Sequence, residues 1–153
     1  MFGKIKYISD NTAVVEINKD GNLVSNLMNL HVVFESNGDK LLGEVKNVDE
    51  NSVKIELLGE FAGTRFIAGT IKKPTLTSTL RVINEEELDI IMGKADENSL
   101  YIGKSRIYKD RSIYANINDL FSNHLAIFGN SGSGKSCSVS RIVQNIFLNQ
   151  NFL

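Results

Sequence analysis

One motif limits how the end of this sequence can fold. The run from Gly129 to Ser136, Gly-Asn-Ser-Gly-Ser-Gly-Lys-Ser, fits the phosphate-loop pattern G-x-x-x-x-G-K-[ST] at every position. Such a loop joins a buried strand to the start of a helix, and the apolar run at 125–128 predicts that strand. A helix is predicted after the loop, because apolar residues recur at helical spacing: Val139, Ile142, Val143, Ile146 and Phe147. A glycine-rich turn that matches by chance is the alternative, and it would not need these flanking elements.

The residue types of the motif suit phosphate binding. Glycines let the backbone approach a phosphate, and successive N–H groups then form an anion nest at the positive end of the helix. We expect Lys135 to contact the β- and γ-phosphates of ATP as the catalytic residue, and Ser136 to bind Mg²⁺. For Cys137, a small helix residue near the ligand is favoured over a reactive thiol. The predicted nucleotide-binding residues are Gly129, Asn130, Ser131, Gly132, Ser133, Gly134, Lys135, Ser136 and Cys137.

Acidic residues are absent after the motif: none of the 17 residues that follow Ser136 is Asp or Glu. A phosphate-loop NTPase also needs an acidic site, usually at the end of another strand, to hold Mg²⁺ and to position water. Further parallel strands would be needed to cover the predicted strand and helix. We therefore expect the N-terminal portion of a longer ATPase, with this portion inactive in hydrolysis by itself.

Composition excludes several other classes. The net charge is −1, and no segment has the dense Lys/Arg cluster of a stand-alone nucleic-acid-binding protein. One cysteine excludes an internal disulfide framework, and two histidines with that cysteine do not make a four-ligand zinc site. No run reaches the length of a membrane span and no apolar signal core follows Met1, so no membrane association and a cytoplasmic location are expected.

Residues 1–83 are expected to form a small closed antiparallel β-barrel. The segment has many short predicted strands and little helical periodicity. A closed barrel is favoured because it leaves no unpaired edge strands. The Asp49–Ser52 turn predicts a hairpin, and Asn18–Asn22 a loop. We interpret the glycines at 43, 59, 63 and 69 as bends or bulges at barrel corners, in preference to close approach to a partner. Strands are predicted at 3–8, 12–17, 31–34, 40–48, 53–57, 66–71 and 79–83.

A short helix follows the barrel. Asn84 and Glu87 form a capping-box pattern, and Gly93 is placed to end the helix. We expect the acidic residues 85–87 to stabilise the N-terminus of this helix through the helix dipole, in preference to forming a metal or catalytic cluster. Two further strands are predicted in the connector, at 99–103 and 113–117.

Barrel, connector and phosphate loop together resemble the N-terminal part of HerA-type ATPases, relatives of the FtsK translocases. The resemblance rests on segments in this order: Leu58-Gly-Glu-Phe-Ala-Gly, Arg65-Phe-Ile-Ala-Gly, Pro74, Leu80-Arg-Val-Ile, Ile102-Gly-Lys and His124-Leu-Ala-Ile-Phe-Gly-Asn-Ser-Gly-Ser-Gly-Lys-Ser. It implies a barrel like that of rotary ATP synthase subunits, followed by a RecA-like motor domain. The fold class expected is therefore mainly β: a small closed antiparallel β-barrel, then the first strand, phosphate loop and helix of a truncated RecA-like α/β domain.

The resemblance also implies an activity. Its members assemble as homo-hexamers that use ATP and Mg²⁺ to move double-stranded DNA, with a partner nuclease or an anti-phage effector docked on the barrel. The family loop more commonly has Thr where this sequence has Ser131. The family's acidic residues, arginine finger and DNA-contacting loops would lie beyond Leu153. A His before the loop strand is common in the family, but we interpret His124 as a boundary residue in preference to a γ-phosphate sensor.

The predicted organisation has three parts: a barrel at 1–83, a helix and connector strands at 84–123, and the start of the ATPase domain at 124–153. Two alternatives stay open. The barrel could act mainly as an oligomerisation or partner-docking module with nucleotide binding only, or the chain could be a rotary-ATPase-like subunit.

Overall fold

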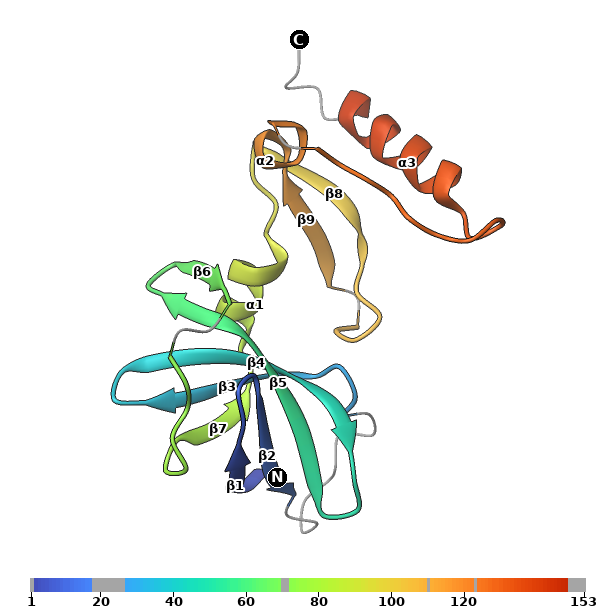
Figure 1. Cartoon of the computed structure of the whole chain (residues 1–153). Coiled ribbons are helices and arrows are strands. Elements are labelled where there is room, and N and C mark those ends of the chain that lie inside the picture. The colour runs from blue at the N-terminus through green and yellow to red at the C-terminus, as the bar shows by residue number, and fades with distance from the viewer. Residues whose placement is uncertain (1, 18–26, 70–71, 110, 123, 149–153) are drawn as a thin grey trace. The chain divides into compact units, whose positions relative to one another are not determined.

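The computed structural model describes residues 2–17, 27–69, 72–109, 111–122 and 124–148. The chain divides into two units, residues 1–87 and 88–153 (Figure 1). The predicted three-part division stays a prediction.

The first unit is built on one antiparallel sheet. Its hydrogen-bonded order is β1-β2-β5-β4-β3-β7, and β6 pairs with β5 (Figure 1). Every strand overlaps a predicted one, while the predicted loop at 18–22 and the end of the strand predicted at 66–71 lie outside the described residues. The strands are β1 (Phe2–Ile8), β2 (Thr12–Ile17), β3 (His31–Ser36), β4 (Asp39–Val48), β5 (Ser52–Ala62), β6 (Arg65–Ala68) and β7 (Thr79–Val82).

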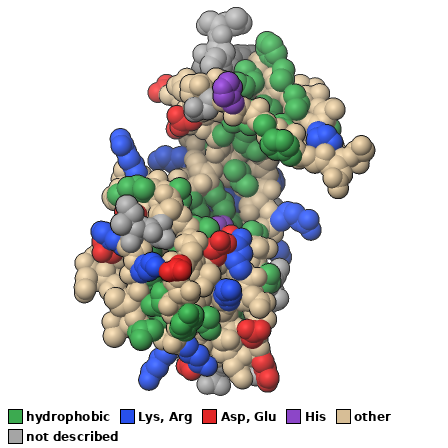
Figure 2. All heavy atoms as spheres, viewed as in Figure 1, with side chains coloured by type: hydrophobic (Ala, Val, Ile, Leu, Met, Phe, Trp, Pro, Cys, Tyr) green, Lys and Arg blue, Asp and Glu red, His purple; other side chains and the backbone are tan. Residues whose placement is uncertain are grey.

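Alternation along the strands builds the core of this unit. In β5, Val53, Ile55 and Leu57 are buried while Lys54 between them is exposed. The predicted hairpin between β4 and β5 is confirmed, because Asp49 N–H donates to the Ser52 carbonyl at 2.8 Å. The outer surface of the unit carries Lys and Arg side chains interspersed with Asp and Glu (Figure 2). The sheet therefore has one apolar face and one solvated face, as antiparallel sheets commonly do.

The predicted mainly-β class is confirmed, but closure of the barrel is wrong. The sheet curls strongly into a half-barrel and stays open. Among the described residues, β1 pairs with β2 and β7 pairs with β3, and no ladder joins these two edges. Curling arises at bulges, where register shifts interrupt the pairing of β4 with β5 near Gly43 and Asn47. β7 is a four-residue edge strand, and its pairing among the described residues is with β3.

Two of the predicted bulge or corner glycines pack against neighbouring strands. A methyl group at Gly43 would overlap the Ile55 side chain and approach the Phe34 ring, and Gly43 does lie at a bulge. A methyl group at Gly59 would overlap the carbonyl oxygen of Ile67 on β6 and the ring of Phe66. Gly59 is therefore required by close approach of a strand within the same sheet.

Helix α1 (Glu85–Met92) has the predicted ends. Glu87 N–H donates to Asn84 Oδ1 at 2.8 Å, and Asn84 N–H donates to Glu87 Oε2 at 3.2 Å. This reciprocal pair is the predicted capping box. Gly93 follows with a φ of 71°, so the helix ends where glycine was expected to stop it.

The second unit also contains the hairpin of β8 (Ser99–Lys104) and β9 (Ser112–Asn116), helix α2 (Ile117–Ser122) and helix α3 (Lys135–Leu148). The hairpin strands match the predicted ones within a residue or two, and a register shift between Tyr101 and Gly103 bulges β8. α2 was not predicted, because six residues are too few to show helical periodicity.

The predicted strand at 125–128 does not form. Residues 124–130 have no regular secondary structure, and the side chains of Leu125 and Phe128 are 50% and 91% exposed. A parallel strand is held by hydrogen bonds to a neighbouring strand, and the described residues supply none here. α3 forms as predicted but buries none of its residues. Across the described residues, no helix has the length and apolar character needed to cross a membrane.

Candidate functional site

The phosphate-loop residues form a turn that leads directly into α3. Gly132 and Gly134 have φ angles of 79° and 86°, in the left-handed region that favours glycine. A methyl group at either position would meet no atom within 4 Å. These glycines are therefore required by backbone conformation, and the space over the loop is open to a ligand.

Backbone hydrogen bonds give the loop its shape. Ser133 N–H donates to the Asn130 carbonyl at 3.1 Å, which closes the turn. At the helix start, both the N–H and the hydroxyl of Ser138 donate to the Gly134 carbonyl, at 2.9 Å and 3.1 Å. Within the described residues, the N–H groups of Gly132 and Gly134 donate no backbone hydrogen bond. The first N–H groups of α3 also lack partners inside the helix, as in any helix.

The Lys135 side chain folds back over this turn. Its Nζ donates to the Asn130 carbonyl oxygen at 2.7 Å. One cation thus lies at the N-terminus of a helix that has no acidic residue in its first turn. Residues 124–153 contain Lys135 and Arg141 but no Asp or Glu, so this segment has a positive net charge.

The other predicted site residues are exposed and close in sequence. Gly129, Asn130, Ser131 and Ser133 lie in the loop, and Ser136 and Cys137 lie in the first turn of α3. The structure thus places the predicted set together, and their roles stay predictions. His124 is exposed in the segment before the loop. No group of three or more His, Cys, Asp or Glu residues suited to a metal ion occurs in the described part of the chain.

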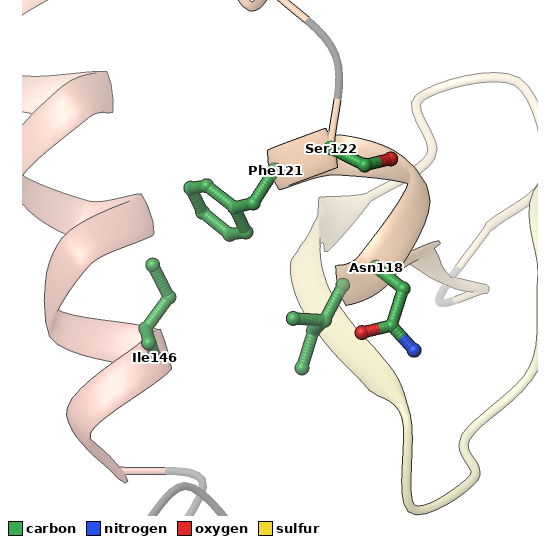
Figure 3. A pocket seen from close by; sticks show the side chains of 5 residues that line it. Asn118, Phe121, Ser122 and Ile146 are labelled. Carbon is green, nitrogen blue, oxygen red and sulfur yellow. The ribbon is translucent and has the colours of Figure 1, made fainter.

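Two contacts of the C-terminal half of α3 were not predicted. Asn145 Nδ2 donates to the Tyr101 carbonyl of β8 at 2.7 Å. Ile146 faces Phe121 of α2 across an apolar groove of about 430 Å³ that Ile117 also lines (Figure 3). Other hydrophobic side chains of this helix remain exposed, among them Val143 and Phe147. No sequence pattern could have shown the Asn145 bond, because it joins residues 44 positions apart.

The comparison with known families identifies this region. Residues 100–152 match the family described as the central domain of the helicase HerA. This part of the chain is similar to the central domain of HerA. The match spans the β8–β9 hairpin, α2, the phosphate loop and α3. It confirms, at the level of the family, the resemblance to HerA-type ATPases inferred from the sequence. No match was found among the curated proteins.

Proposed function

We propose that residues 129–136 bind the phosphates of ATP, and that the chain forms part of a HerA-type ATPase that moves double-stranded DNA. One observation carries this proposal: a complete phosphate-loop sequence turns directly into the N-terminus of α3, within the HerA match. The left-handed glycines, the open space above them and the N–H groups at the helix start all suit a bound anion.

Each residue has a role in this proposal. The N–H groups of the loop and of the first turn of α3 donate to phosphate oxygens. Lys135 exchanges its hydrogen bond with the Asn130 carbonyl for the β- and γ-phosphates, and so moves from a neutral acceptor to an anionic one. The Ser136 hydroxyl is the ligand for Mg²⁺, which, when bound, neutralises charge on the same phosphates.

Binding and hydrolysis have different requirements. The site as described supplies donors and a cation, which suffice to hold a polyphosphate. A carboxylate that positions water is not available from residues 124–153. We therefore assign nucleotide binding to these residues, and place the acidic part of the hydrolytic machinery outside them.

The wider assembly is also a proposal. We infer a homo-hexamer in which the half-barrel of the first unit docks a nuclease or an anti-phage effector. A second candidate is a docking module that binds nucleotide without turning it over. Its support is that the loop and the first turn of α3 supply donors and a cation for a polyphosphate by themselves. ATP turnover by the chain with its partners would decide against it.

The nucleotide site is tested by Lys135→Ala, with Arg141→Ala as the matched control. Arg141 is an exposed cation on the same helix, and it forms no ion pair among the described residues. Loss of a charged hydrogen-bond donor costs about 1.5–3 kcal/mol, or roughly 10- to 150-fold in affinity. We expect Lys135→Ala to weaken Mg-ATP binding by that factor in calorimetric titration, and Arg141→Ala to change it less than about two-fold. Equal affinity of Lys135→Ala and the wild type would refute the site.

A further inference from the structure

Three cations lie at the turn between β8 and β9, and none has a carboxylate partner among the described residues. Lys104, Arg106 and Lys109 lie within six residues of sequence and are all exposed. Among the described residues, none of the three takes part in an ion pair. Asp110, the one acidic residue of this turn, lies outside the described residues. The turn therefore presents local positive charge on a chain whose net charge is −1.

Many other cations of the chain are paired. Lys72 contacts Asp39 at 2.8 Å, and Lys40 contacts Glu87 at 3.1 Å. Such pairs neutralise the surface of the first unit locally. The cations of the β8–β9 turn differ, because they are close together in sequence and form no ion pair with any carboxylate in the described part of the chain.

Hydrogen bonds hold the turn in a defined conformation. Ser105 N–H donates to the Arg111 carbonyl at 2.9 Å, and Arg111 N–H donates to the Tyr108 carbonyl at 3.1 Å. Ser105 Oγ accepts from the N–H groups of Ile107 and Tyr108, at 3.2 Å and 3.1 Å. The Arg111 guanidinium is also ion-paired with Asp89 of α1. The base of the turn is thus anchored, and the loss of entropy when a ligand binds is correspondingly small.

We propose that the tip of the β8–β9 hairpin binds the phosphate backbone of double-stranded DNA. A two-stranded antiparallel ribbon has the width that the major groove admits. Three cations in sequence on an exposed turn suit successive phosphates of a polymer, whereas a small anion is normally held in a concave site. A membrane surface is less well matched, because Ile107, 43% exposed, is the one large apolar side chain exposed among the described residues of this turn. The choice of DNA accords with the proposed translocase function, which this inference deepens.

The proposal predicts a defined salt dependence. Each phosphate that a cation neutralises contributes about −0.9 to the slope of log K against log salt concentration. Three such contacts give a slope of about −2.7. Binding by one chain is therefore weak at physiological salt and measurable at low salt.

The test uses the full chain and a fluorescent duplex of mixed sequence, followed by anisotropy over a series of low salt concentrations without nucleotide. The hairpin variant combines Lys104→Gln, Arg106→Gln and Lys109→Gln. The control combines Lys4→Gln, Lys54→Gln and Arg65→Gln, three exposed cations of the first unit without ion pairs among the described residues. Both variants change the net charge equally.

We expect the wild type and the control to give slopes of about −2.7 and the hairpin variant a slope near zero. Each single hairpin substitution should reduce the slope by about 0.9. An equal reduction of the salt slope in the hairpin variant and the control would indicate diffuse electrostatic attraction to the whole chain and would overturn the proposal. Absence of binding by the wild type at low salt would also overturn it, as would binding to anionic vesicles without binding to duplex DNA.

Mg-ATP titration of the same variants separates this proposal from the nucleotide site. We expect the hairpin variant to bind Mg-ATP within about two-fold of the wild type, because the substituted cations lie outside the phosphate loop. Lys135→Ala should leave the DNA salt slope unchanged. Failure of ATP binding in the wild type, with the DNA slope retained, would refute the nucleotide site and leave the hairpin assignment standing.

Discussion

Glu87 offers the sharpest stability test of the first unit. It is 4% exposed, and its carboxylate accepts from Arg81 through two contacts, at 2.6 Å and 2.8 Å, and from Lys40 at 3.1 Å. Arg81 also donates to Glu35 at 2.7 Å and 3.1 Å. Since these partners lie on β3, β4 and β7, the carboxylate joins the start of α1 to the sheet. Glu87→Gln removes the charge and keeps the size of the side chain.

The pKa of Glu87 sets the size of the stability loss expected for Glu87→Gln. Burial by itself would raise this pKa, but hydrogen bonds from Arg81, from Asn84 N–H and from Lys40 outweigh burial and lower it from 4.5 to about 2. At 1.36 kcal/mol per pH unit, that difference corresponds to about 3 kcal/mol. The Arg81 and Lys40 side chains are 34% and 45% exposed, so solvent screening reduces the expected loss to about 2 kcal/mol.

The pH dependence follows from the direction of the change. Because the folded pKa lies below the unfolded one, the stabilisation is complete above about pH 4.5 and is lost as the pH falls towards about 2. Urea unfolding should show Glu87→Gln less stable than the wild type by about 2 kcal/mol near neutral pH, with the gap narrowing in acid. Glu86→Gln, an exposed neighbour on the same helix turn, should lose about 0.5 kcal/mol or less. A Glu87→Gln variant as stable as the wild type, or a gap constant with pH, would refute the reasoning.

Two further outcomes are expected from the same unfolding measurements. Gly59→Ala should destabilise by about 1–3 kcal/mol, because its methyl group overlaps the Ile67 carbonyl, whereas Gly103→Ala, with no atom within 4 Å, should cost less than about 0.5 kcal/mol. Equal effects would contradict the close packing of β5 against β6. Burial lowers the pKa of His31 below its ordinary 6.5, more than the neighbouring Glu44 raises it. His31 therefore stabilises the fold above about pH 6.5, and the wild type should lose stability on acidification below that pH, a loss that His31→Gln should reduce. Identical pH profiles of His31→Gln and the wild type would contradict a lowered pKa of the half-buried His31.

The strands of the first unit could be predicted because their pattern is local. Alternation in the run Val53-Lys-Ile-Glu-Leu indicates a half-buried strand without knowledge of its partner. The capping box of α1 was equally local, since Asn84 and Glu87 are three residues apart. Closure of the barrel could not be predicted, because it depends on whether β1 meets β7 across the whole length of the sheet. The hydrogen bond between Lys40 and Glu87 could not be predicted either, because these residues are 47 positions apart in the sequence.

In the second unit, the limit of prediction lies at residues 125–128. Their apolar sequence indicates a buried strand, yet they stay irregular and Phe128 is largely exposed. An apolar run indicates that a segment is stable as a strand when its side chains are buried. The run itself does not provide the neighbouring strands that would bury them. α3 likewise has apolar side chains that are not buried, among them Val143 and Phe147.

The phosphate loop adopts a defined turn although the strand predicted before it, at 125–128, does not form. Its turn is fixed by the left-handed Gly132 and Gly134, by the Ser133-to-Asn130 bond and by the Lys135 ammonium on the Asn130 carbonyl. All these contacts join residues at most five positions apart, so the loop needs no parallel sheet to hold its shape. Binding a phosphate then requires Lys135 to exchange one hydrogen bond, and no segment has to fold. Hydrolysis differs, because its carboxylate must be brought to the loop by long-range structure. We therefore expect nucleotide affinity and turnover to be separable in this protein, with affinity set by residues 129–136 and turnover by the packing that covers α3.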